Sequence, residues 1–141
     1  MTAAPFSVRG KQVAVVGAAR SGIAAAELLV RRGARVTLTE VKSHIDDEQR
    51  LRDAGVELEF GGHREATLAG ADLVVLSPGV PSNQPAIEAA RHAGVPIMGE
   101  LELASRWLRG RLVAITGTKG KSTTTAALGE MLAAAGVAVL H

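Results

Sequence analysis

A glycine-rich stretch that contains a lysine–serine pair lies near the end of the sequence, within RLVAITGTKGKSTTT at residues 111–125. An apolar run precedes it and a helix-forming run follows it, which is the setting of a phosphate-binding loop. Backbone N–H groups at a helix N-terminus attract an anion, the helix dipole adds to this attraction, and Gly117 and Gly120 allow the chain to curl. The full pattern of this loop has glycine where Ile115 stands, so the sequence predicts a shortened variant.

Two side chains of this loop supply the chemistry that a triphosphate needs. Lys121 can reach the β- and γ-phosphates, and the Ser122 hydroxyl can bind Mg²⁺, a cation that prefers oxygen ligands. The predicted ATP-binding residues are Gly117, Thr118, Lys119, Gly120, Lys121, Ser122 and Thr123. The alternative is an ordinary glycine-rich turn between a strand and a helix.

A second glycine-rich loop lies near the N-terminus, in VVGAARSGIAA at residues 15–25. Gly17 and Gly22 occupy the outer positions of the G-x-G-x-x-G pattern that binds dinucleotides, and Glu40 ends the next predicted strand, where an acidic residue would bind a ribose. Ala19 replaces the middle glycine and places a methyl group where a diphosphate approaches the backbone. A nicotinamide cofactor is therefore one interpretation, and a turn that only packs a helix on a strand is another.

The overall composition limits the classes of protein to which the chain can belong. It has 141 residues, of which 47% are hydrophobic, enough for one domain with a core and a small additional part. A formal net charge of +2 and an aromatic content of 2% predict no nucleic-acid-binding surface. No apolar run reaches membrane length, the first residues lack a signal-peptide core, and cysteine is absent. We therefore expect no membrane association and a cytoplasmic location.

Helix-like segments that end in glycine and lead into apolar runs recur along the chain, at Gly33, Gly55, Gly94 and Gly136. Glycine is favoured as the left-handed residue that closes a helix, and such apolar runs are typical of buried parallel strands. The predicted strands cover residues 12–17, 35–40, 56–60, 72–77, 95–98, 111–116 and 137–140. The predicted helices cover residues 21–32, 46–54, 84–93, 100–108 and 121–135, with a short unassigned segment at 63–70.

This alternation predicts an α/β fold, a Rossmann-like open parallel sheet with right-handed crossovers and helices on both faces. Ligands of such sheets bind at the carboxyl ends of the strands. Most of those ends are small, polar or charged in this sequence, as in GAARSG, TEVK, GGHRE, SPGVPSN, MGE and GTKGKST.

Four stretches together resemble the Mur ligase family of peptidoglycan synthesis, namely GAARSGIAAAELLVRRGARVT, ADLVVLSPGVP, GELELA and AITGTKGKSTTT. Lys119 and Ser122 in the last stretch are similar to the branch of this family that adds D-glutamate. The resemblance implies a Rossmann-like domain that binds the UDP part of a substrate over residues 1–110, and the incomplete start of a P-loop ATPase domain over residues 111–141. It also implies that the chain is a fragment that is inactive alone, with the rest of the ATPase and the amino-acid site beyond His141.

The activity implied by the resemblance is that of an ATP-dependent ligase that forms an amide bond, with UDP-N-acetylmuramoyl-L-alanine, D-glutamate and ATP as substrates and Mg²⁺ as a cofactor. The substrate carboxylate would attack the γ-phosphate, and the amine of D-glutamate would displace phosphate from the resulting acyl phosphate. The catalytic Lys121 would offset the charge on the transferred group.

The UDP contacts that the resemblance implies, matched by position, are Arg20, Ser21, Val41, Lys42 and Ser77. The residues themselves also allow plainer roles. Ser77 is suited to a turn with Pro78 and Gly79, and Lys42 is suited to a solvated surface charge.

Two other classes of protein remain open, an NAD(P)-binding Rossmann domain of a dehydrogenase and a free-standing regulatory module. A P-loop directly after the domain is hard to explain in the first class. Apolar residues on both faces of the helix in TTTAALGEMLAAAG argue against the second.

That helix exposes an apolar face and the strands predicted beside it have unpaired edges, so we expect residues 111–141 to self-associate or to be less ordered than residues 10–105. The apolar face consists of Ala127, Leu128, Met131 and Leu132.

Overall fold

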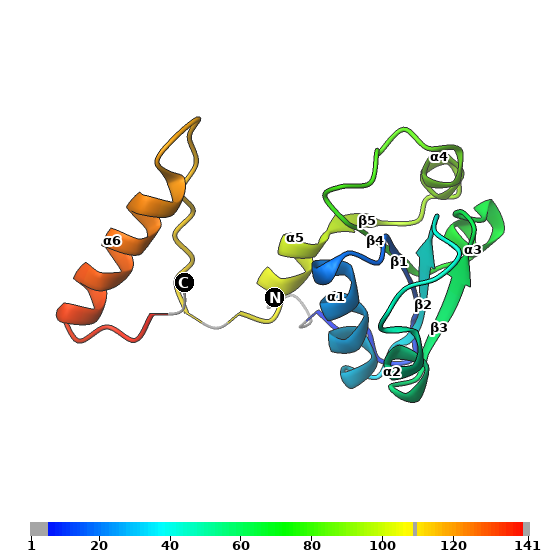
Figure 1. Cartoon of the computed structure of the whole chain (residues 1–141), viewed down its shortest axis with the longest axis horizontal. Helices are drawn as coiled ribbons and strands as arrows, with labels where there is room; N and C mark the ends of the chain where they lie inside the picture. The colour runs from blue at the N-terminus through cyan, green and yellow to red at the C-terminus, as the bar shows by residue number, and fades with distance from the viewer. Residues whose placement is uncertain (1–5, 109, 140–141) are drawn as a thin grey trace, which may run out of the picture. The chain divides into compact units, whose positions relative to one another are not determined.

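The computed structural model describes residues 6–108 and 110–139, and the chain divides into two compact units, Met1–Leu108 and Arg109–His141. The larger unit contains a parallel sheet covered by helices, and the smaller unit contains one helix preceded by a loop (Figure 1). The assignment of a separate biochemical role to each unit stays a prediction.

Five parallel strands form the sheet of the larger unit in the order β3-β2-β1-β4-β5. Their bounds are Gln12–Val16 for β1, Arg35–Glu40 for β2, Val56–Phe60 for β3, Leu73–Leu76 for β4 and Ile97–Gly99 for β5. At the centre of the sheet, Val15 of β1 lies opposite Leu38 of β2 and Val75 of β4. Strands β2 and β3 lie on one side of β1, and β4 and β5 lie on the other. The strand order thus reverses between β1 and β4, the position where ligands bind in open α/β sheets. The predicted Rossmann-like sheet is confirmed.

Helices cover both faces of this sheet, as the sequence predicts (Figure 1). Their bounds are Arg20–Arg31 for α1, Glu48–Asp53 for α2, Glu65–Ala69 for α3, Pro85–His92 for α4 and Glu100–Ser105 for α5. Val13 and Val15 of β1 pack in one core with residues of α1, α2 and α5. The alternating residues Ala14 and Val16 pack in a second core with α3 and α4. Because successive strand residues point to opposite faces, one buried apolar strand supports both layers.

The last strand of the sheet is shorter than the predicted segment 95–98. The Val95 N–H donates to the Ala90 carbonyl at 2.9 Å, which closes α4, and Pro96 has no N–H to donate. Only the Pro96 carbonyl pairs with the sheet, accepting the Val74 N–H at 2.9 Å. Strand β5 therefore begins at Ile97.

The smaller unit contains helix α6, Lys121–Ala134, close to the predicted bounds. The strand predicted over 111–116 is wrong, because these residues form no regular element and Leu112 and Val113 are 69% and 63% exposed. An apolar run becomes a strand only when a neighbouring strand pairs with it, and residues 110–139 contain no strand. The second predicted strand is also absent over 137–139, and position 140 lies outside the described residues. None of the helices in the described part of the chain has the length and apolar character needed to cross a membrane.

Candidate functional site

The two outer glycines of the first loop are required by close packing at the start of α1. Gly17 has a left-handed φ of 98°, and its N–H donates to the Thr39 carbonyl at 2.9 Å. A Cβ at Gly17 would lie 2.9 Å from a methyl group of Val80, and a Cβ at Gly22 would lie 2.1 Å from the Gly17 carbonyl oxygen. Close packing alone therefore explains why both positions are glycine, and the two glycines do not by themselves indicate that a dinucleotide binds.

The N-terminus of α1 is open at the carboxyl edge of the sheet. Ala19 precedes the helix with extended backbone, and no side chain caps the first turn. Arg20 and Ser21 are exposed there. Uncapped N–H groups with a helix dipole behind them favour an anion, and Arg20 adds a formal positive charge beside them.

The Glu40 carboxylate holds the first loop against the end of β2. It accepts the Ala18 N–H at 2.7 Å and the Lys42 N–H at 3.2 Å. Burial acts to raise the pKa of Glu40, but hydrogen bonds from the backbone of Ala18, Lys42 and Val41, together with the Lys42 charge, outweigh it and lower the pKa. Glu40 is therefore an ionised acid that already has partners, rather than a free acceptor for a ribose.

A pocket of about 400 Å³ opens beside this loop and brings together three of the five predicted UDP contacts, Ser21, Val41 and Ser77. Its wall also contains Gly17, Ala19, Glu40, His63, Pro78, Gly79, Val80, Pro81 and Gln84. Val41 is 59% exposed and offers an apolar surface to a planar ring.

The other two predicted contacts, Arg20 and Lys42, line a second pocket of about 500 Å³ between α1 and the segment that leads to α2. Neither side chain forms an ion pair within residues 6–108. Arg20 and Lys42 directly follow Ala19 and Val41, which line the first pocket. A ligand that extends beyond the first pocket can therefore also contact these two cations. The structure thus divides the predicted site between an apolar part and a cationic part.

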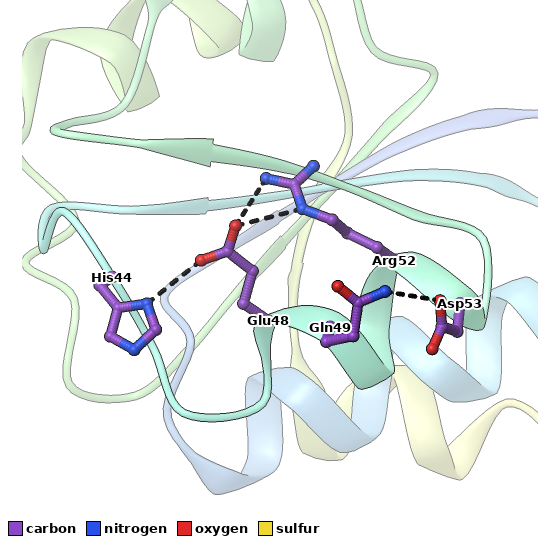
Figure 2. Close-up of polar contacts among 5 residues, drawn as sticks. All are labelled: His44, Glu48, Gln49, Arg52 and Asp53. Atoms are coloured by element: carbon purple, nitrogen blue, oxygen red, sulfur yellow. Dashed lines mark hydrogen bonds and ion pairs between the residues drawn. The ribbon is translucent and has the colours of Figure 1, made fainter.

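Most of the other charges in the second pocket and in α2 are paired with one another. Arg50 forms ion pairs with Asp47 at 2.8 Å and with Glu27. Figure 2 shows Glu48 between His44, at 3.2 Å, and Arg52, at 2.9 Å. Hydrogen bonds from Arg52 and then from His44 lower the pKa of Glu48. Because these groups neutralise one another, the charges of the second pocket that form no ion pair are the cations Arg20 and Lys42 and the carboxylate of Asp46. Arg20 and Lys42 are the two that can attract an anionic ligand.

Ser77 is a predicted UDP contact whose polar groups already have hydrogen-bond partners within the protein. It is 2% exposed, its hydroxyl hydrogen-bonds to the Glu100 carboxylate and lies 3.3 Å from the Gly17 carbonyl oxygen. Its backbone N–H donates to Val16, and its carbonyl accepts the Val80 N–H at 3.0 Å. The turn interpretation therefore accounts for Ser77 in this structure, and a ligand contact would require its hydroxyl to leave Glu100 or Gly17.

His63 is a pocket residue that the sequence analysis did not select. It follows β3, and its Nδ1 lies 2.7 Å from the hydroxyl oxygen of Thr39, which is fully buried on β2. Burial lowers the pKa of His63, although the charges of Glu40 and Glu59 act in the opposite direction. The one available signal was its place in GGHRE, directly after a predicted strand at the carboxyl edge of the sheet.

The loop before α6 has the features of an anion site in the smaller unit. Gly120 precedes the helix with a left-handed φ of 76°, and no side chain caps the first turn. The Lys121 ammonium donates to the Gly117 carbonyl, so the lysine folds back over the loop. Ser122 and Thr123 are exposed in the same first turn. A single hydroxyl fits Mg²⁺ only as one of several oxygen ligands, since this cation keeps waters and phosphate oxygens around it.

Comparison with known proteins places the chain in a family. Residues 11–99 match the model of the MurD-like N-terminal domain of Mur ligases. These residues include all five strands of the sheet, so the fold of the larger unit is that of a Mur ligase N-terminal domain and the chain belongs to the Mur ligase family.

Individual relatives agree with this assignment. The chain is 46% identical over 134 residues to the UDP-N-acetylmuramoylalanine–D-glutamate ligase of Koribacter versatilis, and 52% identical over 134 residues to the ligase of the same name from Anaeromyxobacter dehalogenans. These matches cover 93% of this chain but only 30% and 29% of the relatives. Among solved structures, a murein peptide ligase from Psychrobacter arcticus matches 90% of the chain with a TM-score of 0.65 and 27% identity, over 27% of its own length.

Proposed function

We propose that this chain is the N-terminal part of an ATP-dependent ligase that adds D-glutamate to UDP-N-acetylmuramoyl-L-alanine in peptidoglycan synthesis. The observation that carries the proposal is the 43–52% identity to D-glutamate ligases over about nine tenths of the chain. Because the chain spans about 30% of those relatives, the activity, the substrates and a cytoplasmic location are inferred for it from the family.

The larger unit is proposed to bind the UDP part of the substrate at the carboxyl edge of the sheet. The apolar surface of Val41 suits the uracil ring, while the open N-terminus of α1 with Arg20 and Lys42 suits the diphosphate. Ser21, in the first turn of α1, lines the same pocket as Val41. Ser77 is proposed to contribute through the shape of its turn, because its hydroxyl has partners within the protein.

The loop before α6 is proposed to bind the phosphates of ATP. The backbone of Gly117, Thr118, Lys119 and Gly120 would surround the phosphates, and the N–H groups of Lys121, Ser122 and Thr123 would face them. The ammonium of Lys121, which contacts the Gly117 carbonyl, would turn to the γ-phosphate and offset its charge as the substrate carboxylate attacks. Mg²⁺ bound with the Ser122 hydroxyl as one ligand would neutralise further phosphate charge.

Calorimetric titration of the 141-residue chain tests the ligand of the larger unit. We expect UDP and UDP-N-acetylmuramoyl-L-alanine to bind, and NADH to bind more weakly, because Ala19 and the engaged Glu40 remove the features that a dinucleotide uses. Tighter binding of NADH would overturn the proposal and favour the nicotinamide-binding class.

A further inference from the structure

His63 joins two strand ends at the wall of the pocket assigned to the nucleotide. It lies three residues after the end of β3 at Phe60, and its Nδ1 is 2.7 Å from the hydroxyl of Thr39 on the neighbouring strand β2. The Thr39 carbonyl in turn accepts the N–H of Gly17, in the loop before α1. The ring is therefore linked through Thr39 to the backbone of Gly17, which also lines the pocket.

The hydrogen bond to Thr39 determines which nitrogen of His63 carries the proton. Thr39 is 0% exposed, and its hydroxyl has no other hydrogen-bond partner within residues 6–108. If Nδ1 donated to Thr39, the hydroxyl proton of Thr39 would be buried without an acceptor, which costs more than the alternative arrangement. Thr39 therefore donates to Nδ1, and the neutral ring of His63 carries its proton on Nε2.

The remaining nitrogen of His63 is a donor without a partner. Nε2 makes no hydrogen bond within the larger unit, residues 6–108, although the ring lines the pocket and is only partly buried. No buried side-chain nitrogen or oxygen among the described residues lacks a hydrogen-bond partner, so Nε2 is accessible to solvent and free to donate to an incoming group. An acceptor atom of a bound ligand would satisfy it.

The surrounding charges indicate which part of a nucleotide this donor meets. The carboxylates of Glu40 and Glu59 act electrostatically on His63, so a phosphate placed against the ring would be repelled. The cations Arg20 and Lys42 line the second pocket, and the open end of α1 meets the first pocket at Ala19 and Ser21 rather than at His63. The β2–β3 side of the pocket therefore suits an uncharged acceptor, such as a carbonyl oxygen of a pyrimidine base.

We propose that His63 is a positioning residue for the nucleoside part of the ligand, donating a hydrogen bond from Nε2 to a carbonyl oxygen of the base. This inference rests on the proposed function, because it takes a uridine nucleotide as the ligand of the pocket. It adds a residue outside the five contacts predicted from the sequence.

Two substitutions separate this role from a purely structural one. In His63→Asn, the amide oxygen replaces Nδ1 as the acceptor and can stay bonded to the Thr39 hydroxyl, but the donor at Nε2 is lost. In His63→Gln, the amide nitrogen reaches the position of Nε2, but the contact with Thr39 is lost. His92→Asn, at the exposed end of α4, is the matched control.

The experiment measures binding of UDP, uridine and inorganic pyrophosphate to the 141-residue chain, together with the unfolding temperature of each variant. We expect His63→Asn to bind UDP and uridine about 3- to 10-fold more weakly, the loss of one hydrogen bond, with pyrophosphate binding and unfolding temperature unchanged. His63→Gln should unfold at a lower temperature but bind UDP more tightly than His63→Asn.

Three outcomes would contradict the account. Normal UDP binding by His63→Asn would overturn the inference and leave the proposed function intact. A loss of affinity that follows the loss of stability across both variants would assign His63 a structural role only. Failure of the unsubstituted chain to bind UDP at all would overturn the proposed function, and this inference with it.

Discussion

The two glycine-rich loops have similar local structure, but their contacts with the rest of the protein differ. Each precedes an uncapped helix whose first two residues are a cation and a serine, Arg20 and Ser21 in one and Lys121 and Ser122 in the other. The first loop is fixed from two strands, through the Thr39 carbonyl and the Glu40 carboxylate of β2 and through the turn at Ser77 that follows β4. The second is fixed by its own residues, through the contact of Lys121 with Gly117.

This difference teaches what a short motif can and cannot specify. The helix N-terminus, its dipole and the adjacent cation follow from local sequence, because they depend on residues within one turn. The rigidity of the site depends on contacts made across the sheet. Substitutions in the first loop should therefore affect folding and binding together, while those in the second should affect chemistry alone.

The largest expected effect concerns chemistry at the second loop. In a full-length ligase that carries this sequence, Lys121→Ala should reduce turnover about 100-fold or more, since it removes the charge that stabilises the transferred phosphoryl group. In the 141-residue chain the same substitution should leave UDP affinity unchanged, and the chain alone should release no ADP in response to the substrates. Steady-state kinetics and calorimetry measure these quantities. Near-normal turnover would show that this loop is not the ATP site.

A smaller but still large effect is expected on the stability of the first loop. Gly22→Ala should destabilise the larger unit by about 2–4 kcal/mol, because the added Cβ meets the Gly17 carbonyl oxygen at 2.1 Å. Urea unfolding followed by fluorescence of Trp107, the single tryptophan, measures this free energy. Gly79→Ala is the control, since nothing lies within 4 Å of a Cβ there. Equal stability of the two variants would show that the start of α1 is not packed as described.

Self-association should be a weaker effect, and it should depend on the smaller unit. Met131 is 70% exposed on α6, and Leu112 and Val113 are exposed before it. We expect the average mass from light scattering to rise with concentration, and Met131→Glu to reduce this rise, because apolar patches favour association. Leu101→Glu, at an 81% exposed position of the larger unit, is the control. A mass independent of concentration would contradict the prediction.

The smallest effect should be the dependence of stability on pH. His63 has a pKa lowered from 6.5, so stability should be constant above pH 6.5 and decrease as pH falls from there to the lower folded-state pKa. Glu40 has a pKa lowered from 4.5, so its contribution is present above pH 4.5 and is lost as pH falls through the folded-state pKa. We expect the decrease caused by His63 to be only about 2–4 °C in unfolding temperature. This decrease should disappear in His63→Asn, and its persistence in that variant would assign it to another group.

Much of the fold could be predicted because its signals are local. The glycines that close helices at 33, 55, 94 and 136 all have positive φ angles, and the strands of the larger unit lie where the apolar runs predict them. The strand over 111–116 could not be judged in the same way, because pairing depends on a distant neighbour.

The candidate site was less predictable than the fold, because its contacts join residues far apart in sequence. Ala18 meets Glu40, Thr39 meets His63 and Ser77 meets Glu100 across 22 to 24 positions. Each contact depends on the register of the sheet, which no local pattern specifies. The sequence therefore predicted Ser77 as a ligand contact but did not reveal its hydrogen bonds to Gly17 and Glu100 within the protein.

The central claim is that the carboxyl-edge pocket of the larger unit binds the uridine diphosphate part of a substrate. Amide chemical shifts of the 141-residue chain, followed by nuclear magnetic resonance during titration with UDP, test it most directly. We predict the largest changes at Ser21, Val41, Lys42 and His63, with the second glycine loop changing only when ATP is added. Shift changes confined to residues 117–123, or none near Val41 and His63 at saturating UDP, would contradict the account.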